Sequence, residues 1–181
     1  QEVADVWLHL ALAIAALAIA GIRGDLKRRQ AWELLATLDK ALTAYYRQTG
    51  EWPANAATAA SAPARWIVPP NRAGERGDPA PSEVMADRVI AILDSVPASQ
   101  ELLNRIPPVL QTHQGGQRRL QDPWGRRLRC LTLASPAAVD FQAVLANGNR
   151  PIFISAGENG RSAGATPAEV ADDLRSDELP R

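Results

Sequence analysis

The residues best suited to chemistry in this chain carry oxygen-rich side chains near its C-terminus. A turn punctuated by glycine, SAGENG at residues 155–160, is followed at a distance by an acidic run, ADDLRSD at residues 171–177. The candidate ligands in these two patches are Glu158, Asn159, Asp172, Asp173 and Asp177. Because hard cations prefer carboxylate, amide and backbone oxygens, the two patches could meet around one such ion. A plain solvated acidic tail is the alternative.

Side chains that could act as nucleophiles or general bases are sparse. The histidines are His9, inside an apolar run, and His113, in a polar stretch that we expect to be solvated surface. Cys130 is the single cysteine, which excludes an intramolecular disulfide and a cysteine-rich zinc site, and we expect it to be a small buried hydrophobe. No phosphate-binding loop or paired zinc spacing occurs in the sequence. We therefore expect a protein that is not an enzyme.

Length and charge narrow the class of protein further. The chain has 181 residues, and its 20 lysines and arginines balance its 20 aspartates and glutamates. A chain of this size builds one modest domain beside an anchor, and a balanced charge gives no global field that would recruit nucleic acid. Local clustering is still present. Arginines gather at Arg118, Arg119, Arg126, Arg127 and Arg129. We expect them to lie on solvated strand faces, with a partner-binding patch as the alternative.

A long stretch without proline, residues 6–49, must position everything else. Its first part, residues 6–22, is almost wholly apolar, at the lower end of the roughly 17 to 25 residues that span a bilayer. The residues ahead of it include Glu2 and Asp5 rather than a basic segment, which favours a retained anchor over a removed signal peptide.

The second part of this stretch predicts an amphipathic helix. Its apolar residues fall on one helical face: Leu26, Ala31, Leu34, Leu35, Leu38, Ala41, Leu42 and Tyr45. Gly50 and Pro53 mark its end. We expect four residues of this face to bury against the strands that carry Leu131, Val144 and Phe153. They are Leu35, Leu38, Leu42 and Tyr45.

The middle of the chain predicts helices and loops. Residues 54–81 read as an irregular loop pinned by Trp66, Ile67 and Val68. A helix over residues 83–95 is expected with Ser82 as its cap, and Ser99 can cap a short turn after it. Residues 112–117 are expected to form a loop.

After residue 119 the pattern changes to short apolar runs that are typical of strands. Residues 128–133, 141–145 and 151–155 are the predicted strands, joined as an antiparallel meander. The tail, residues 156–181, has too few apolar residues to form an element of its own. The fold class is therefore α+β, with a long N-terminal helix packed on a small antiparallel sheet.

The order of these features resembles the pseudopilins of type II secretion systems and, more broadly, the type IV pilin-like proteins. The resemblance rests on the helix ending in ALTAYYRQTGEWP, on a DPWG turn at residues 122–125 that leads into a strand, and on FISAGENG followed by ADDLRSD. It implies an N-terminal transmembrane half-helix, residues 1–25, and a pilin-like globular domain, residues 26–181. Within that domain we expect the amphipathic helix at 26–50, a variable region at 54–118, strands at 119–155 and an acidic loop at 156–181.

The resemblance also implies a role. Members of this family are structural subunits of a pseudopilus, and the major subunits hold calcium in the C-terminal loop. We therefore expect a non-catalytic subunit in the inner membrane, with its domain in the periplasm, whose partners are other pilin-like subunits, secretion platform proteins and cargo. The alternative is an anchored ligand-binding or enzymatic domain unrelated to secretion.

The charges around the apolar run point to the opposite topology. Arg23, Lys27, Arg28 and Arg29 follow the run, and by the positive-inside rule this favours a cytoplasmic domain. We give the order of the motifs more weight and expect the periplasmic side.

Overall fold

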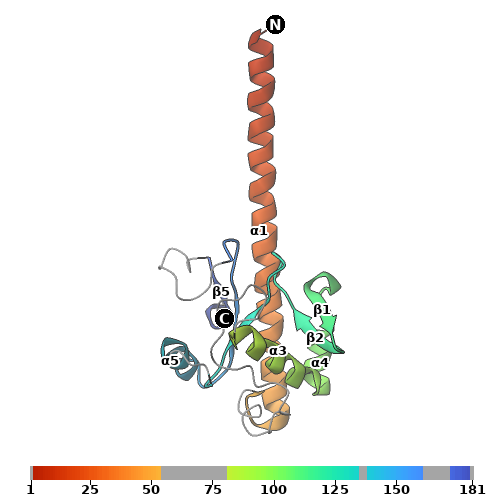
Figure 1. Ribbon diagram of the computed structural model, residues 1–181, viewed down its shortest axis with the longest axis vertical. Coiled ribbons are helices and arrows are strands. Elements are labelled where there is room, and N and C mark those ends of the chain that lie inside the picture. The colour runs from red at the N-terminus through yellow and green to blue at the C-terminus, as the bar shows by residue number, and fades with distance from the viewer. Residues whose placement is uncertain (1, 54–80, 135–137, 161–171, 180–181) are drawn as a thin grey trace.

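The computed structural model shows an α+β protein in which a long N-terminal helix packs against small antiparallel sheets (Figure 1). It describes the backbone of residues 2–53, 81–134, 138–160 and 172–179, and the side chains of residues 21–53, 82–134, 140–160 and 172–179. The helices are α1 (Glu2–Thr49), α3 (Pro81–Asp94), α4 (Pro97–Leu103) and α5 (Ala138–Ala146), with 3-10 turns η2 (Pro108–Leu110) and η3 (Ser176–Glu178). The strands are β1 (Gln111–Gln114), β2 (Gln117–Leu120), β3 (Arg129–Leu131), β4 (Ile152–Ser155) and β5 (Leu174–Arg175).

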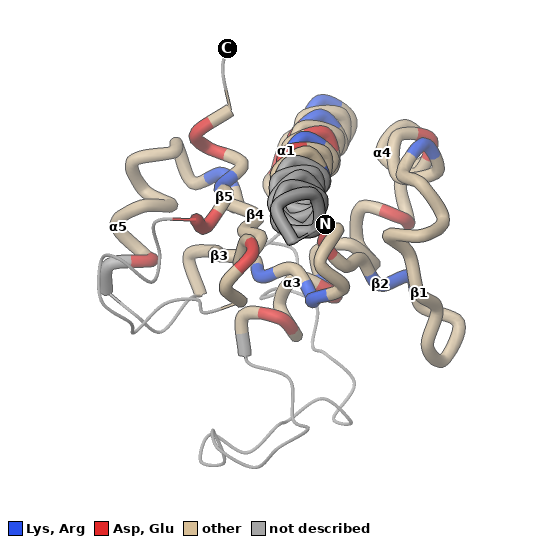
Figure 2. The backbone as a smooth tube through the Cα atoms, turned by 90° about the horizontal axis from the view of Figure 1, so that it is seen from above, with Lys and Arg blue, Asp and Glu red and all other residues tan. Residues whose placement is uncertain are grey.

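Helix α1 is the axis of the molecule, and the other elements gather around its C-terminal half (Figure 1). Seen end-on, α1 lies between the β3–β4–β5 sheet and the pair formed by α4 and the β1–β2 hairpin (Figure 2). The predicted apolar face is buried from Ala31 to Tyr45. Leu26, at the start of this apolar face, is 53% exposed among the described residues. Gly50 ends α1 with a φ of 78°, as predicted.

The predicted membrane segment falls mostly on residues whose side chains lie outside the described set. In the part of the chain that the structure describes, no helix is long and apolar enough to cross a bilayer. The predicted loop over residues 54–81, with Trp66, Ile67 and Val68, also lies outside the described residues, except for Pro81 at the start of α3.

The main core lies between α1, α3, α4 and one face of the sheet. Leu38 of α1, Ile90 of α3 and Phe153 of β4 are all fully buried in it. The expected packing of Phe153 on the α1 face is therefore confirmed. The expectation for Leu131 and Val144 is wrong, because they belong to a second cluster with the other apolar residues of β4.

That second cluster exists because residues 141–145 are helical, not a strand. Helix α5 connects β3 to β4 and packs against β3, so Val144 is buried on the face of α5 that contacts the sheet. Residues 147–149, which a meander of the predicted strands would use as a hairpin turn, end this helix instead. Gly148 and Asn149 have φ of 68° and 65°, and the Asn149 N–H donates to the Val144 carbonyl at 2.9 Å. A residue in the left-handed region is a common helix terminator as well as a hairpin residue, which is why the sequence misled.

Two further strand regions differ from the expectation. The predicted loop over 112–117 is a hairpin, in which β1 and β2 pair through a turn at Gly115 and Gly116 with φ of 60° and 77°. The tail does form an element, because β5 pairs antiparallel with β4 in the order β3-β4-β5. Two residues suffice because β4 already supplies a buried partner strand.

The first residues of α3 and α4 also differ from the expected helix starts. Helix α3 begins at Pro81, so Ser82 lies inside its first turn and is not its cap. Val96 precedes α4 and Pro97 is its first residue. Ser99 lies buried inside α4, where its hydroxyl donates to the Val96 carbonyl at 3.0 Å.

Candidate functional site

The DPWG turn is built around a buried carboxylate. Asp122 is 1% exposed, and its Oδ1 accepts the backbone N–H of Trp124 at 3.0 Å and of Arg126 at 2.9 Å. Gly125 closes the turn with a φ of 81°, and its N–H donates to the Asp122 carbonyl at 2.9 Å. The sequence predicts this use of aspartate and glycine. Trp124 is partly buried and packs against the main core.

The second carboxylate oxygen of Asp122 joins this turn to the SAGENG turn. Ser155, at the end of β4, donates its hydroxyl to Asp122 Oδ2 at 2.8 Å, and both residues are buried. Residues 122–126 and 155–160 therefore lie side by side, although more than 30 residues separate the two motifs at this bond. We call these segments the paired turns.

Arg126 makes the second connection between the paired turns. Its Nη1 donates to the Gly157 carbonyl, and its Nη2 donates to the Glu158 carbonyl at 2.7 Å. The guanidinium also lies against the backbone of Gly160, where a Cβ would come closer than 3.0 Å to its atoms. Gly160, with a φ of 67°, thus gives the turn both its backbone conformation and the space for Arg126.

The acidic run reaches the same turn from the other side. Both carboxylate oxygens of Asp172 accept hydrogen bonds from Asn159, Oδ2 from the backbone N–H at 2.8 Å and Oδ1 from the side-chain amide. Gly157, with a φ of 58°, permits this approach, because a Cβ there would lie within 3.0 Å of the Asp172 backbone oxygen. The structure therefore brings together Asn159 and Asp172, two of the predicted ligands.

The other predicted ligands are not brought together in this way. Glu158 is exposed and contributes its backbone carbonyl to Arg126. Asp177 pairs with Arg175, at 3.0 Å from Nε and 2.8 Å from Nη2. Hydrogen bonding to Asp177 raises the pKa of Arg175. This pair fixes the short turn after β5.

Asp173 is the one predicted ligand with an unpaired buried oxygen in the described structure, its Oδ1. Burial raises the pKa of Asp173 to about 6; Arg129 lowers it and Asp172 raises it. No group of three or more histidine, cysteine or acidic side chains placed to hold a metal occurs among the described residues. Calcium binding stays a prediction from the sequence.

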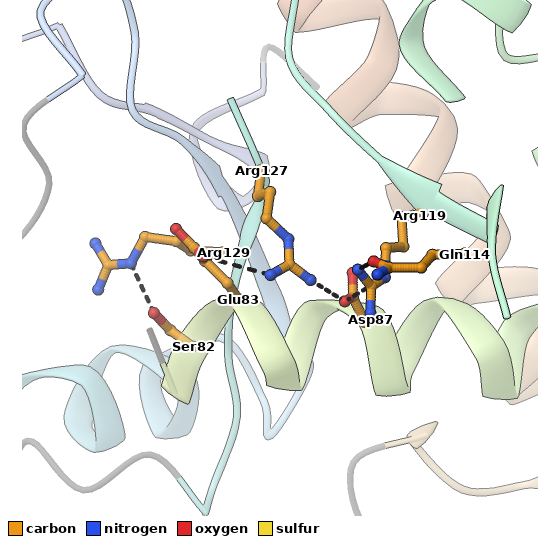
Figure 3. A network of polar contacts seen from close by, with 7 residues as sticks. All are labelled: Ser82, Glu83, Asp87, Gln114, Arg119, Arg127 and Arg129. Carbon is orange, nitrogen blue, oxygen red and sulfur yellow. Dashed lines mark hydrogen bonds and ion pairs between the residues drawn. The ribbon is translucent and has the colours of Figure 1, made fainter. Parts of the chain in front are cut away.

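The arginine cluster is half-buried and mostly ion-paired, so the expectation of solvated strand faces is wrong. Arg118 and Arg127 have side chains only 10% and 29% exposed, and they pair with acidic residues of α3. Figure 3 shows Asp87 of α3 between Arg127, which pairs with it through Nη2, and Arg119, whose Nε lies 3.2 Å away. Arg127 also lies 3.8 Å from Glu83. The cluster thus clamps α3 onto the strand region.

Arg129 and Arg118 also contact α3, whereas Arg126, the fifth member of the cluster, belongs to the paired turns. Arg129 donates its Nε to the Ser82 hydroxyl at 2.8 Å (Figure 3), and Arg118 lies 3.5 Å from Asp94. Burial raises the pKa of Asp87, although its two arginine partners lower it, so removal from water outweighs the attraction of the pairs. These ion pairs join α3 to the strand region at several points along the helix.

One polar contact that the sequence did not point to ties the sheet to α1. Arg150, just before β4, pairs with Asp39 at 2.8 Å and donates to the Thr43 hydroxyl at 2.6 Å. Its guanidinium also lies 5.4 Å from the ring centre of Trp52, which stacks on Tyr46. Arg150 was an isolated arginine after a turn, so nothing in the sequence marked it.

Cys130 and His113 are placed as the sequence predicts, whereas the side chain of His9 lies outside the described set. Cys130 is fully buried, and burial raises the pKa of its thiol, which makes it a poor nucleophile. His113 is exposed on the hairpin strand β1. Within the paired turns the Ser155 hydroxyl donates to the Asp122 carboxylate, but both residues are buried. The other described contacts there are hydrogen bonds that join the two segments, and this arrangement suits structural closure or binding. Comparisons of this chain with protein families, with curated proteins and with solved structures found no match.

Proposed function

We propose that this protein is a non-catalytic, membrane-anchored structural subunit of a pilus-like filament, of the kind found in the type II secretion pseudopilus. Its N-terminal helix bundles with the helices of other subunits in the inner membrane and in the filament. Its globular domain lies on the periplasmic side and faces neighbouring subunits and cargo. The resemblance of the motifs, in their order along the chain, is the starting point of this proposal.

The observation that carries the proposal is the division of α1 into two parts. From Ala31 to Tyr45 the apolar face of α1 is buried in the domain, whereas residues 21–30 are largely exposed. Ile22 and Leu26 are 61% and 53% exposed on this uncovered part. A single helix that both builds a domain core and projects exposed apolar residues beyond it suits assembly through that projection.

The paired turns give secondary support. The DPWG and SAGENG motifs carry the resemblance, and they contact each other through Ser155, Asp122 and Arg126. Motifs that meet in space are better evidence of a common design than motifs that share only an order in sequence.

An anchored enzyme or ligand-binding domain is the alternative, and no specific contact among the described residues favours it. The genes that flank this one separate the two classes cheaply. A secretion ATPase and a prepilin peptidase encoded nearby support the filament subunit.

The direct test is cross-linking of the full-length protein in the membranes of its own host. Single cysteines are introduced as Ile22→Cys or Leu26→Cys and treated with a thiol-specific cross-linker. Cys130 can remain because it is fully buried, and the parent protein shows its background. Arg105→Cys is the matched control, since its side chain is 65% exposed on the domain far along the chain from α1.

We expect cross-linked dimers and larger species at positions 22 and 26 well above those at position 105. Monomers at both helix positions, with position 105 no different, contradict assembly through α1. Labelling Val109→Cys, which is 74% exposed, with a membrane-impermeant maleimide in spheroplasts tests the topology separately. Labelling only after the membrane is broken places the domain in the cytoplasm and contradicts the periplasmic assignment.

A further inference from the structure

We propose that the guanidinium of Arg126 is a built-in cation for the C-terminal loop, so that the SAGENG turn closes onto the acidic run without bound calcium. The resemblance implies calcium in this loop, and the described side chains do not assemble the site that it needs. Calcium takes about six to eight oxygen ligands, and here the Gly157 and Glu158 carbonyls and both carboxylate oxygens of Asp172 already accept hydrogen bonds from the protein.

The first argument is the pair of carbonyls that converge on Arg126. Gly157 and Glu158 are consecutive, and both carbonyl oxygens accept from the two Nη atoms of the same guanidinium. Consecutive carbonyls aimed at one point form an electronegative concavity, which a metal ion can fill. The planar fork of arginine satisfies two such acceptors at once and carries a permanent positive charge.

The second argument is the fit of the turn around the guanidinium. At Gly160 a Cβ would come within 3.0 Å of three atoms of the Arg126 guanidinium group, Cζ, Nε and Nη1. Arg126 itself is fixed at its backbone, because its N–H donates to buried Asp122 at 2.9 Å and its carbonyl accepts from the Asp122 N–H at 2.7 Å. The arginine is therefore held from behind by the DPWG turn and enclosed in front by the SAGENG turn.

The third argument is the use of Asp172, the carboxylate of the acidic run that contacts the turn. Both of its oxygens accept from Asn159, so they are committed to closing the loop. A divalent ion between Asp172 and the Gly157 carbonyl would have to displace these bonds and stand beside the positive charge of Arg126. Like charges placed this close repel, and the repulsion is stronger in a partly buried site than in bulk water.

Amide hydrogen exchange of the full-length protein in detergent tests this inference. The reporters are the N–H groups of Asn159 and Gly160, which donate to Asp172 Oδ2 at 2.8 Å and to the Ala156 carbonyl at 3.1 Å. Exchange is followed in excess calcium and in the chelator EGTA, for the wild type and for Arg126→Gln. Arg105→Gln is the matched control, since it removes the same charge from an exposed ion pair with Glu101.

We expect wild-type exchange at both reporters to be the same in calcium and in EGTA. In Arg126→Gln we expect it to be at least about tenfold faster, because hydrogen bonds to charged groups hold the loop, and Arg105→Gln should match the wild type. Slow exchange of the buried α1 amides, such as that of Leu38, verifies that the variant is folded. If Arg126→Gln does not fold, Arg126→Lys replaces it, with an expected intermediate acceleration because one ammonium cannot reproduce the fork.

Two results overturn the inference. Exchange in the wild type that accelerates on adding EGTA shows that calcium holds the loop. Unchanged exchange in a folded Arg126 variant shows that the guanidinium is dispensable. Because neither result depends on subunit contacts, a failure here leaves the assembly proposal standing, and a failure of cross-linking leaves this inference standing.

Discussion

The apolar face of α1 and the paired turns both hold the domain together, but different forces act in them. Leu35, Leu38 and Leu42 are fully buried in a cluster of apolar side chains, where attraction is non-directional. The paired turns depend on Asp122 and Arg126, each of which satisfies specific donors or acceptors. Burial of apolar area tolerates a change of shape, whereas a directional contact fails when one atom is missing.

The largest expected loss of stability comes from removing a side chain from the apolar core. Leu38→Ala removes a fully buried side chain and leaves a cavity, so we expect it to lower the free energy of unfolding by about 2 to 5 kcal/mol. Leu38→Met keeps most of the volume and should cost less than about 1.5 kcal/mol. Urea denaturation of the purified protein measures both.

Leu26→Ala is the matched control for this prediction, since Leu26 lies on the same helix and is 53% exposed. Its effect should stay within about 0.5 kcal/mol. A loss below about 1 kcal/mol for Leu38→Ala would mean that this face contributes little to the core.

A smaller loss of stability is expected from removing a buried polar group of the paired turns. Asp122→Ala leaves the N–H groups of Trp124 and Arg126 and the hydroxyl of Ser155 without their acceptor. Leaving buried donors unpaired costs about 1 to 3 kcal/mol, so the same urea experiment should show a loss in that range. Asp25→Ala, at an exposed position on α1, should change stability by less than about 0.5 kcal/mol. Equal effects at the two aspartates would refute the role given to Asp122.

The smallest expected effect is a dependence of stability on pH that comes from Asp173. Burial raises the pKa of Asp173 to about 6, with further effects of Arg129, Asp172, Arg175 and Glu178. Between its ordinary pKa and about 6 the folded protein binds more protons at this carboxyl than the unfolded chain does. Its contribution to stability therefore rises as pH falls through about 6 and is lost as pH rises.

The variant Asp173→Asn removes this titration. We expect it to melt at a higher temperature than the wild type at about pH 7.5, and the difference should shrink towards about pH 5. Thermal melts at the two pH values measure it. A constant difference between the two proteins across this range would show that Asp173 does not titrate there.

Apolar burial could be predicted from the sequence more easily than the directional polar contacts could. The buried face of α1 was predictable from Ala31 to Tyr45, because apolar spacing of three and four residues is a local signal. The exposure of Leu26 was not, because the same spacing continues past the point where the domain stops covering the helix. Helix α5 was missed because short runs of Val, Phe and Leu suit a strand or a buried helix equally.

The polar contacts were harder to predict because their partners lie far apart in sequence. Asp122 and Ser155 were both within recognised motifs, yet nothing local indicated that they bond to each other. The arginine clamp did leave a signal that was overlooked. Glu83, Asp87 and Asp94 fall four and seven residues apart, on one face of α3, and an acidic face on a half-buried helix requires basic partners.

The continuity of α1 from Glu2 to Thr49 has a mechanical consequence. An α-helix advances about 1.5 Å and turns about 100° with each residue, so the rotation and height of the domain are tied to those of the first half of the helix. One residue inserted between positions 22 and 30 would turn the whole domain by about 100° about the helix axis while leaving its core intact. The exposed section of α1 therefore couples the first half of the helix rigidly to the domain. Its length in residues sets the direction in which the domain faces.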